Sequence, residues 1–337
     1  QQGWTAASDK ATNSSKKFGG AMGGRIATLG KYLLATKLIQ LALVALRVIF
    51  IDTAKEAIKF DGALGDLQSV TGSTNEELAG LREVALDTAG ATKLTAVEVV
   101  GLQKELAKLG TSAADIEKLT KPIAQLSQAL GESGAEVAKV FKSILNQFDL
   151  TTNRSVDIAN IIQKSVASSA LDLNGLATGF GYVGTQAALT GLTVEETAAN
   201  LAVLSDNGLK ASKAGTGFRN VLIAATKSGK TYTQFIDDLA KKGLSGAEAL
   251  QLFGKRAAAA GIILVRERQA VKGLSEELND NTAVFDAQIA QMGNAAGQVE
   301  LLKSAYNRLQ ISIGQTVVKS DLFIAAIKQR DNKPSLI

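Results

Sequence analysis

Two glycine-containing motifs are the parts of this sequence that most invite a chemical interpretation. Residues 179–184 are Gly-Phe-Gly-Tyr-Val-Gly, the spacing of the loop that holds the pyrophosphate of a dinucleotide. That loop requires a strand before it, a helix after it and an acidic residue about 20 positions later. Here residues 156–178 have helical spacing, and Asp206 follows a capped helix rather than a strand. The motif therefore indicates a glycine-rich joint where two helices approach closely.

The second motif, Ser-Gly-Lys-Thr at residues 228–231, has the ending of a phosphate-binding P-loop. A P-loop also needs a glycine five residues before Gly229, but Ala224 occupies that position inside an apparent helix. Lys227 and Lys230 are better explained as a charge at a helix C-terminus and a residue of the following turn. The sequence therefore does not favour a nucleotide-binding enzyme.

Acidic pairs are the remaining candidates for catalysis, since glycosidases need two carboxylates across a cleft. Several pairs fall in the first turns of predicted helices, where carboxylates stabilise the helix dipole. The chain has no Cys and no His, which excludes thiol nucleophiles, imidazole bases and Cys/His zinc sites. We therefore expect no catalytic residues, no cofactor and no metal site, and predict that the chain is not an enzyme. The pairs are Glu76-Glu77, Glu195-Glu196, Asp237-Asp238 and Glu276-Glu277.

A recurring helix-start pattern shows which elements carry these motifs. Ser or Thr is followed three residues later by an acid, the capping box that satisfies backbone N–H groups at a helix start. Preceding glycines suit the left-handed residue that ends the previous helix, and Pro122 is expected in a first turn. Strand signals are nearly absent, so the predicted fold is all-α, a multi-helix body of short capped helices. The six boxes are Ser73 with Glu76, Thr95 with Glu98, Ser112 with Asp115, Ser133 with Glu136, Thr193 with Glu196, and Ser245 with Glu248.

Longer helices are predicted at both ends of this body. Residues 25–60 form a long apolar helix, and residues 33–51 come close to the ~20 residues that span a bilayer. Lys37, Gln40 and Arg47 interrupt the apolar residues on one helical stripe. This helix suits an oligomeric bundle, a buried core, or a membrane in which the stripe faces a lumen. Near the C-terminus, residues 283–328 indicate long helices broken near Gly293 and Gly297.

Positive charge is concentrated at the N-terminus. The net charge is +5, and residues 1–60 contain nine Lys or Arg and three acidic residues. Such an arm could contact nucleic acid or anionic lipid, or remain a solvated tail. The predicted organisation is a flexible basic arm (1–24), a long amphipathic helix (25–60), a helical core (61–280), a long helical segment (281–330) and a frayed tail (331–337).

Three stretches of the core carry a family resemblance. Residues 58–72 contain Ile-Lys-Phe-Asp-Gly and end in Val-Thr-Gly, and residues 191–204 begin Gly-Leu-Thr-Val-Glu-Glu. Residues 207–219 are Asn-Gly-Leu-Lys-Ala-Ser-Lys-Ala-Gly-Thr-Gly-Phe-Arg. Together with the helix at 301–314, these segments resemble the core region of tail tape measure proteins of long-tailed bacteriophages. The match departs at Ala211, where the family tends to have Gly, and at Gly217-Phe218. The residues that match the motifs are Phe60, Thr71, Gly72, Gly208, Ala214, Gly215, Thr216 and Arg219.

The resemblance implies a structural protein rather than a catalyst. Tape measure proteins lie in the tail tube as extended helical oligomers, set tail length during assembly and aid genome delivery. The implied partners are further copies of the chain, as a trimer or hexamer, the tail tube and tail-tip proteins, the host inner membrane and the DNA terminus. The implied location is the tail lumen or tip of the virion, with the host membrane or periplasm during infection.

Two further expectations concern the alternative function and the length of the chain. A membrane-active, pore-forming helical protein that assists DNA passage is the alternative to a tape measure segment. Even a fully helical chain of 337 residues would span only about 500 Å. Tape measure proteins are usually longer, and we therefore expect this sequence to be part of a larger polypeptide.

Overall fold

The computed structural model describes residues 54–279, 287, 290 and 295–318, and within these residues every regular element is helical. This confirms the all-α prediction for the described chain. Residues 54–71 form the first described helix, and residues Lys59–Leu309 form one compact unit. The later elements are α2 (Asn75–Gly90), α3 (Ala96–Lys108), α4 (Ala113–Leu130), α5 (Gly134–Gln147), η1 (Thr152–Arg154), α6 (Ser155–Ala167), α7 (Leu173–Leu189), α8 (Val194–Asp206), α9 (Ser212–Lys227), α10 (Tyr232–Lys242), α11 (Gly246–Phe253), α12 (Ala258–Arg266), α13 (Arg268–Leu278) and α15 (Ala295–Val318).

The predicted caps start most of these helices as expected. Thr95, Thr193 and Ser245 form complete capping boxes with Glu98, Glu196 and Glu248. The hydroxyls of Ser112 and Ser133 likewise accept the N–H of the third helical residue. The five glycines that precede predicted helices, at positions 72, 110, 131, 191 and 243, all have φ between +65° and +81°.

One predicted cap is displaced by a residue. Thr74, rather than Ser73, caps α2, and Glu77, rather than Glu76, completes the box. Ser73 is buried, and its hydroxyl donates to Thr71 Oγ1 at 2.7 Å. That hydroxyl therefore belongs to the preceding turn and is not available as a cap.

The prediction that Pro122 begins a helix is wrong, because it lies in the middle of α4. Proline has no N–H to donate to the carbonyl four residues earlier, here that of Lys118. Ser155 Oγ donates to this carbonyl at 3.5 Å. The start of α6 thus supplies a long hydrogen bond at the carbonyl that Pro122 leaves without its usual donor.

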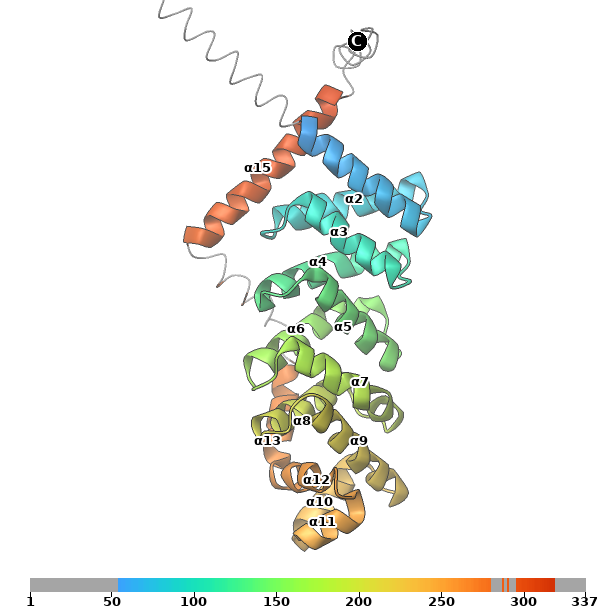
Figure 1. Ribbon diagram of the computed structural model, residues 1–337, viewed down its shortest axis with the longest axis vertical. Coiled ribbons are helices and arrows are strands. Elements are labelled where there is room, and N and C mark those ends of the chain that lie inside the picture. The colour runs from blue at the N-terminus through green and yellow to red at the C-terminus, as the bar shows by residue number, and fades with distance from the viewer. Residues whose placement is uncertain (1–53, 280–286, 288–289, 291–294, 319–337) are drawn as a thin grey trace, which may run out of the picture. The chain divides into compact units, whose positions relative to one another are not determined.

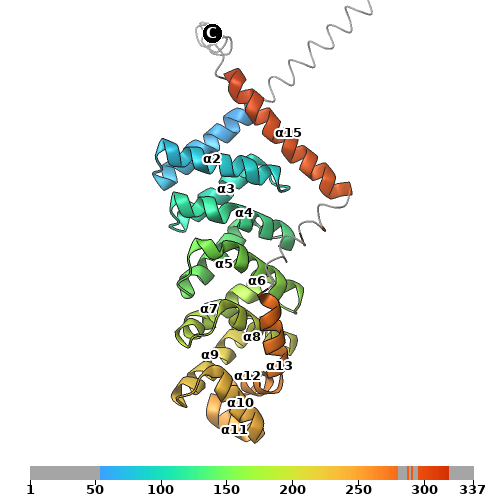
Figure 2. The same cartoon turned by 180° about the vertical axis from the view of Figure 1, so that it is seen from behind.

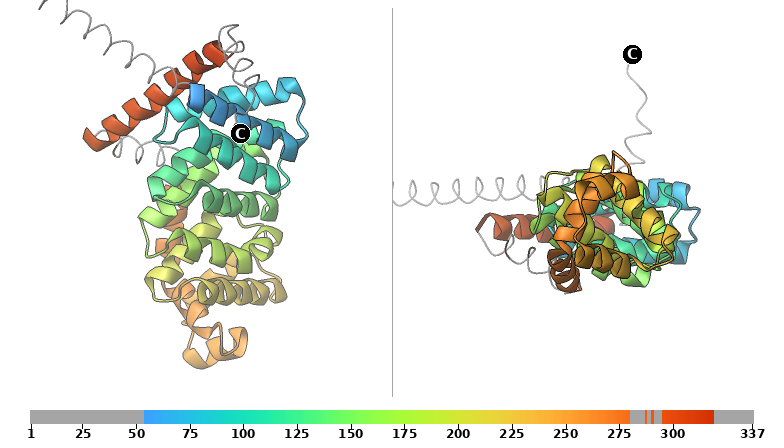
Figure 3. Two further views of the ribbon diagram at one scale, coloured as in Figure 1. Left: turned by 45° about the horizontal axis from the view of Figure 1, so that its top comes forward. Right: turned by 90° about the horizontal axis from the view of Figure 1, so that it is seen from below.

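The helices from α2 to α13, which we call the helix stack (residues 75–278), form two interleaved rows. One row packs α2 on α4, α4 on α6 and α6 on α8, and the other packs α3 on α5, α5 on α7 and α7 on α9. Figures 1 and 2 show the helices following one another in this order, and the left view of Figure 3 shows the same succession. At the end of the stack the chain reverses, and α13 packs against α8 and α6. Apart from α13, the helices of the stack therefore contact mainly their near neighbours in the sequence.

The core between the two rows combines a few aromatic rings with many small side chains. Phe60, Phe141, Phe180 and Phe218 are fully buried, as are many Ala, Leu and Ile side chains. Phe148 meets Phe180 edge to face, with ring centroids 6.0 Å apart. Small residues allow helix axes to approach closely, which compensates for the low aromatic content of the chain.

The terminal helices differ from the expectations in two details. The first described helix continues beyond residue 60 to residue 71, where Thr71 and Gly72 end it. Gly297 lies in the first turn of α15 and does not break that helix. The predicted stripe of Lys37, Gln40 and Arg47, the apolar segment 33–51, Gly293 and the tail 331–337 lie outside the described residues. Among the described residues, no helix combines the length and apolar character needed to cross a bilayer.

Candidate functional site

The glycine motif at 179–184 lies inside α7 and forms a close helix crossing. A Cβ placed on Gly215 of α9 would lie 2.6 Å from the Gly179 carbonyl oxygen and 2.8 Å from Tyr182 Cβ. A Cβ on Gly179 would lie 2.9 Å from a methyl group of Leu201 in α8. These distances are too short for any side chain. The prediction of a glycine-rich helix joint is confirmed, and the structure adds that its partner is Gly215.

The other glycines in or near this crossing differ in how much space surrounds their Cβ positions. A Cβ on Gly217 would lie 2.6 Å from Ala260 Cβ in α12, so α9 is closely packed on a second side. A Cβ on Gly184 would lie 1.9 Å from the flexible end of Gln147. Gly181, in contrast, has open space around its Cβ position. Gly179 and Gly184 therefore serve helix packing, whereas Gly181 does not, and the whole motif lies within one helix.

The turn that leads into α9 has an unusual backbone. Gly208 follows the end of α8 at φ +86°, and Leu209 N–H donates to the Leu204 carbonyl, closing that helix. Ala211 then has φ +49° and ψ −122°, and Lys213 N–H donates to the Lys210 carbonyl at 3.1 Å. These values define a type II′ turn, in which glycine is the preferred residue at the Ala211 position. The departure from the family motif at Ala211 thus falls at a strained residue.

The Ser-Gly-Lys-Thr segment is a turn between two helices, as predicted. Ser228 ends α9, and Gly229 follows at φ +71°. Lys230 Nζ pairs with Asp238 Oδ2 at 2.6 Å, and Thr231 caps α10 in a box with Gln234. The lysine of the motif is therefore paired with a carboxylate of the next helix.

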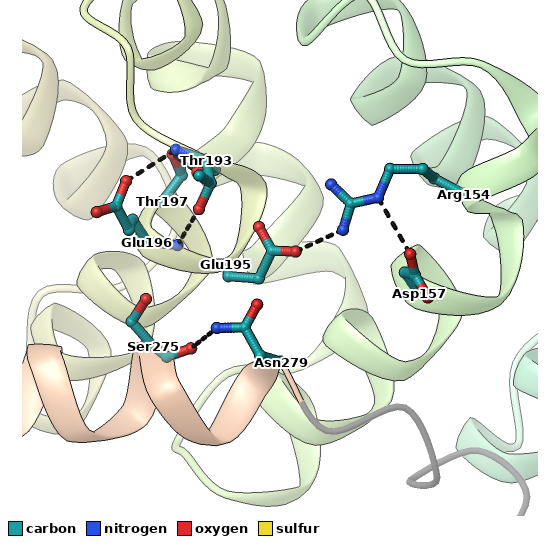
Figure 4. Close-up of polar contacts among 8 residues, drawn as sticks. All are labelled: Arg154, Asp157, Thr193, Glu195, Glu196, Thr197, Ser275 and Asn279. Carbon is teal, nitrogen blue, oxygen red and sulfur yellow. Dashed lines mark hydrogen bonds and ion pairs between the residues drawn. The ribbon is translucent and has the colours of Figure 1, made fainter.

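The acidic pairs are used for caps and ion pairs between helices. Glu196 completes the cap of α8, and the neighbouring Glu195 side chain is only 6% exposed. Arg154 donates to Glu195 Oε1 at 2.7 Å and to Asp157 Oδ2 at 3.1 Å, which joins the start of α6 to α8 (Figure 4). The Glu195 hydrogen bond contributes most to raising the pKa of the Arg154 guanidinium above its usual range. Sequence reasoning missed this pair because its members lie 41 residues apart.

A cavity of about 410 Å³ lies between α8, α10 and α13. At its wall the Tyr232 hydroxyl donates to Asn200 Oδ1, and Asn200 donates to the Glu196 carbonyl at 2.7 Å. Burial raises the pKa of the Tyr232 hydroxyl well above its usual range. Arg268 and Asp237 at the rim have charged atoms 3.7 Å apart. These four wall groups therefore bond to other groups of the protein.

No cluster of carboxylates that could hold a metal ion occurs in the part of the chain that the structure describes. The sequence model of the phage-related minor tail protein family matches residues 82–323 of the chain. The chain belongs to this family. The match begins within α2 and extends through α15.

Two curated relatives of this minor tail protein carry a more specific name. A "Tape measure protein" of Pneumococcus phage Dp-1 is 28% identical over 229 residues, which are 68% of this chain and 19% of the relative. A "Probable tape measure protein" of Escherichia phage P2 is 28% identical over 159 residues, 47% of this chain and 20% of the relative. The chain thus spans about a fifth of the length of these relatives. No solved structure matches it.

The residues that carry the tape measure resemblance lie at several places in the minor tail protein. Phe60 is fully buried, with the Arg82 guanidinium 5.9 Å from its ring centroid. Thr71 Oγ1 donates to the Leu67 carbonyl at 3.0 Å, directly before Gly72. Ala214 is buried beside Gly215, whereas Thr216 is half-buried and Arg219 is exposed. The structure therefore brings Gly215 to the α7–α9 crossing, places Gly208 in the turn before α9, and leaves Phe60, Thr71 and Gly72 near α2.

Proposed function

We propose that this chain is a segment of a phage tail tape measure protein, located in the tail of the virion. The observation that carries the proposal is the coincidence of the minor tail family match with two relatives named as tape measure proteins. The helix stack supports a structural role, because its polar motifs serve caps, turns and helix contacts. In this role the whole protein occupies the tail lumen, contacts the tube and tail-tip proteins and contributes to genome delivery.

The proposal predicts that tail length depends on this protein. Phage lacking its gene should give no tails of uniform length, and a plasmid copy should restore them. An in-frame duplication of Lys59–Leu309, about 250 residues, should lengthen the tail by at most about 380 Å, the length of one continuous helix. Electron microscopy of negatively stained particles measures these lengths.

The matched control is a plasmid copy carrying Gly181→Ala, which changes a helix position with open space around it. That copy should restore normal tails. Normal tails in phage lacking the gene, or absence of the protein from purified tails by mass spectrometry, would contradict the proposal. An unchanged length after duplication would assign length control to other parts of the protein.

A further inference from the structure

Charge is divided unevenly along the helix stack. Residues 54–206 contain twelve Lys or Arg and nineteen acidic residues, whereas residues 207–272 contain twelve Lys or Arg and only four acidic residues. The basic part begins at the turn before α9 and continues into α13. A surface with an excess of one charge attracts partners of the opposite charge. The end of the stack that contains α9 therefore favours an acidic partner.

Three cations lie on the exposed side of α9. Lys213, Arg219 and Lys227 are exposed, and within the described part of the chain no carboxylate pairs with them. Neither α9 nor the neighbouring α7 contains Asp or Glu. Arg219 lies one helical turn after Gly215, so it is on the side of α9 that faces α7. The positive charge of this surface is therefore not neutralised by the helices that form it.

The exposed side of α7 is apolar. Tyr182 is 48% exposed, and Leu189 is 78% exposed, the largest value for a large apolar side chain among the described residues. They lie seven residues apart, which places them on the same side of the helix and about 10 Å from each other along its axis. Because α7 has no charged residue, these two side chains form a short apolar strip.

The apolar strip and the cations belong to one continuous surface. The Cβ position of Gly215 lies 2.8 Å from Tyr182 Cβ, and Leu189 and Leu222 line one hollow of about 360 Å³. Since Gly215 and Leu222 are also seven residues apart, α7 and α9 run side by side in the same direction. We call this surface the α7–α9 face, defined by Tyr182, Leu189, Lys213, Arg219 and Lys227.

The combination of residue types favours a protein partner over a nucleic acid. A phosphate backbone is bound by cations and hydrogen-bond donors, and gains little from an exposed leucine. Protein interfaces instead use tyrosine and arginine as anchors and bury apolar side chains. An amphipathic helix with apolar residues seven apart would match Tyr182 and Leu189, and carboxylates beside them would meet Arg219.

We propose that the α7–α9 face binds an acidic, amphipathic helix of another protein. The apolar side of that helix packs on Tyr182 and Leu189, and its carboxylates pair with Arg219 and Lys227. The proposed function assigns no binding surface to the helix stack, so this inference goes beyond it. Either one can fail while the other holds, because binding is measured on the isolated chain and tail length on the virion.

The experiment measures binding of a labelled helical peptide to the full chain by fluorescence anisotropy. The peptide has about 20 residues, enough for a stable helix, with leucines seven apart and glutamates beside them. It should bind, and a peptide with lysine in place of each glutamate should bind at least about tenfold more weakly. Arg219→Glu and Leu189→Ser should each weaken binding of the glutamate peptide at least about tenfold.

Matched control variants make the same chemical changes elsewhere on the stack. Lys121→Glu reverses the charge of an exposed residue on α4, and Leu250→Ser replaces a leucine of α11 that is 50% exposed. Both should leave the affinity for the glutamate peptide unchanged. Circular dichroism should show native helix content in all four variants, since each change is at an exposed position.

Several results would overturn the proposal. They are no binding of the glutamate peptide, equal affinity for the lysine peptide, or equal losses from the test and control variants. Duplex DNA or anionic vesicles that bind the chain through Arg219 with no effect of Leu189→Ser would assign the face to a polyanion instead. A dimer in sedimentation equilibrium that Leu189→Ser converts to monomer would assign the face to a second copy, which also contradicts the proposal.

Discussion

At the scale of single residues, Ala211 holds a backbone conformation that favours glycine. Its φ of +49° belongs to the first central position of a type II′ turn. We expect Ala211→Gly to increase the free energy of unfolding by about 1 kcal/mol, because glycine relieves the strain of the Cβ. Urea denaturation followed by circular dichroism measures the change. Ser212→Gly, in the same turn, should give no increase, and an equal gain from both variants would contradict the explanation.

Asp115 makes the stability of the α4 start depend on pH. The hydroxyls of Ser112 and Thr152 donate to its carboxylate, both at 2.7 Å, and lower the pKa of Asp115. An unfolded aspartate has a pKa of about 3.9, so the unfolded state binds the proton more readily than the folded state. The stabilisation is therefore complete above that value and is lost as the pH falls through the folded-state pKa.

Thr152→Val should raise the Asp115 pKa towards its ordinary value and reduce stability at neutral pH by about 1 kcal/mol. The loss of stability between neutral and acidic pH should then be smaller than in the unmodified chain. Carboxyl NMR titration and urea denaturation at several pH values provide the measurement. Thr151→Val is the control, since Thr151 makes no side-chain cap bond and should leave the titration of Asp115 unchanged.

At the scale of the helix, the α7–α9 crossing depends on Gly215, whose Cβ position lies next to backbone atoms of Gly179. Gly215→Ala should destabilise the chain by about 1–3 kcal/mol, because the Gly179 carbonyl cannot move aside without shifting α7. Gly181→Ala, within the same sequence motif but in open space, should leave the free energy of unfolding unchanged or raise it by up to about 1 kcal/mol. Thermal denaturation distinguishes the two. Similar losses from both variants would mean that helix contact does not explain the motif.

The ion pair between Arg154 and Glu195 ties α6 to α8. Arg154→Met would leave the nearly buried Glu195 carboxylate without this partner. We expect the free energy of unfolding to fall by about 1–3 kcal/mol. This loss is smaller than for a fully buried pair, because the Arg154 side chain is 38% exposed to solvent. Lys108→Met, which removes an exposed ion pair with Glu105, should reduce the free energy of unfolding by less than about 1 kcal/mol. Denaturant titration of both variants provides the comparison.

The helices were predictable where the determining contacts are local. The boxes at Thr95, Thr193 and Ser245 join residues three apart, so the sequence contains the whole interaction. The α2 start was placed one residue early because Ser73-Thr74 and Glu76-Glu77 offer two equivalent registers. The Thr71–Ser73 contact decides between them. The box at Thr231 was missed because its partner is the amide Gln234 rather than an acid.

The candidate site was predictable only in part, because its contacts join distant residues. The spacing of Gly179 and Gly184 indicated a close approach of helices, but the sequence does not identify Gly215 as the partner. The Arg154–Glu195 pair and the cavity beside Tyr232 likewise form only when α8 packs against α6, α10 and α13. Such pairings depend on how the rows of helices are arranged, which local patterns do not encode.

At the scale of the whole helix stack, distant layers should contribute independently to stability. Leu106 of α3 is fully buried, and Leu106→Ala should cost about 2–5 kcal/mol. Since α3 packs against α2, α4 and α5, whereas Gly215 lies on α9, the two changes share no contacts. In the double variant, the decrease in the free energy of unfolding should equal the sum of the decreases for Leu106→Ala and Gly215→Ala, to within about 0.5 kcal/mol. A coupling energy above about 1 kcal/mol would contradict the packing of α3 and α9 on separate sets of helices.

The packing of the helices from α2 to α9 mainly on their near neighbours has a mechanical consequence. When a chain of this kind is pulled by its ends, tension need not break all of the contacts at once, because each layer is held chiefly by the adjacent layers. The stack should unravel from an end in a series of small steps, each extending the chain by one or two helices. Withdrawal through a narrow opening would then require repeated modest forces instead of a single large rupture.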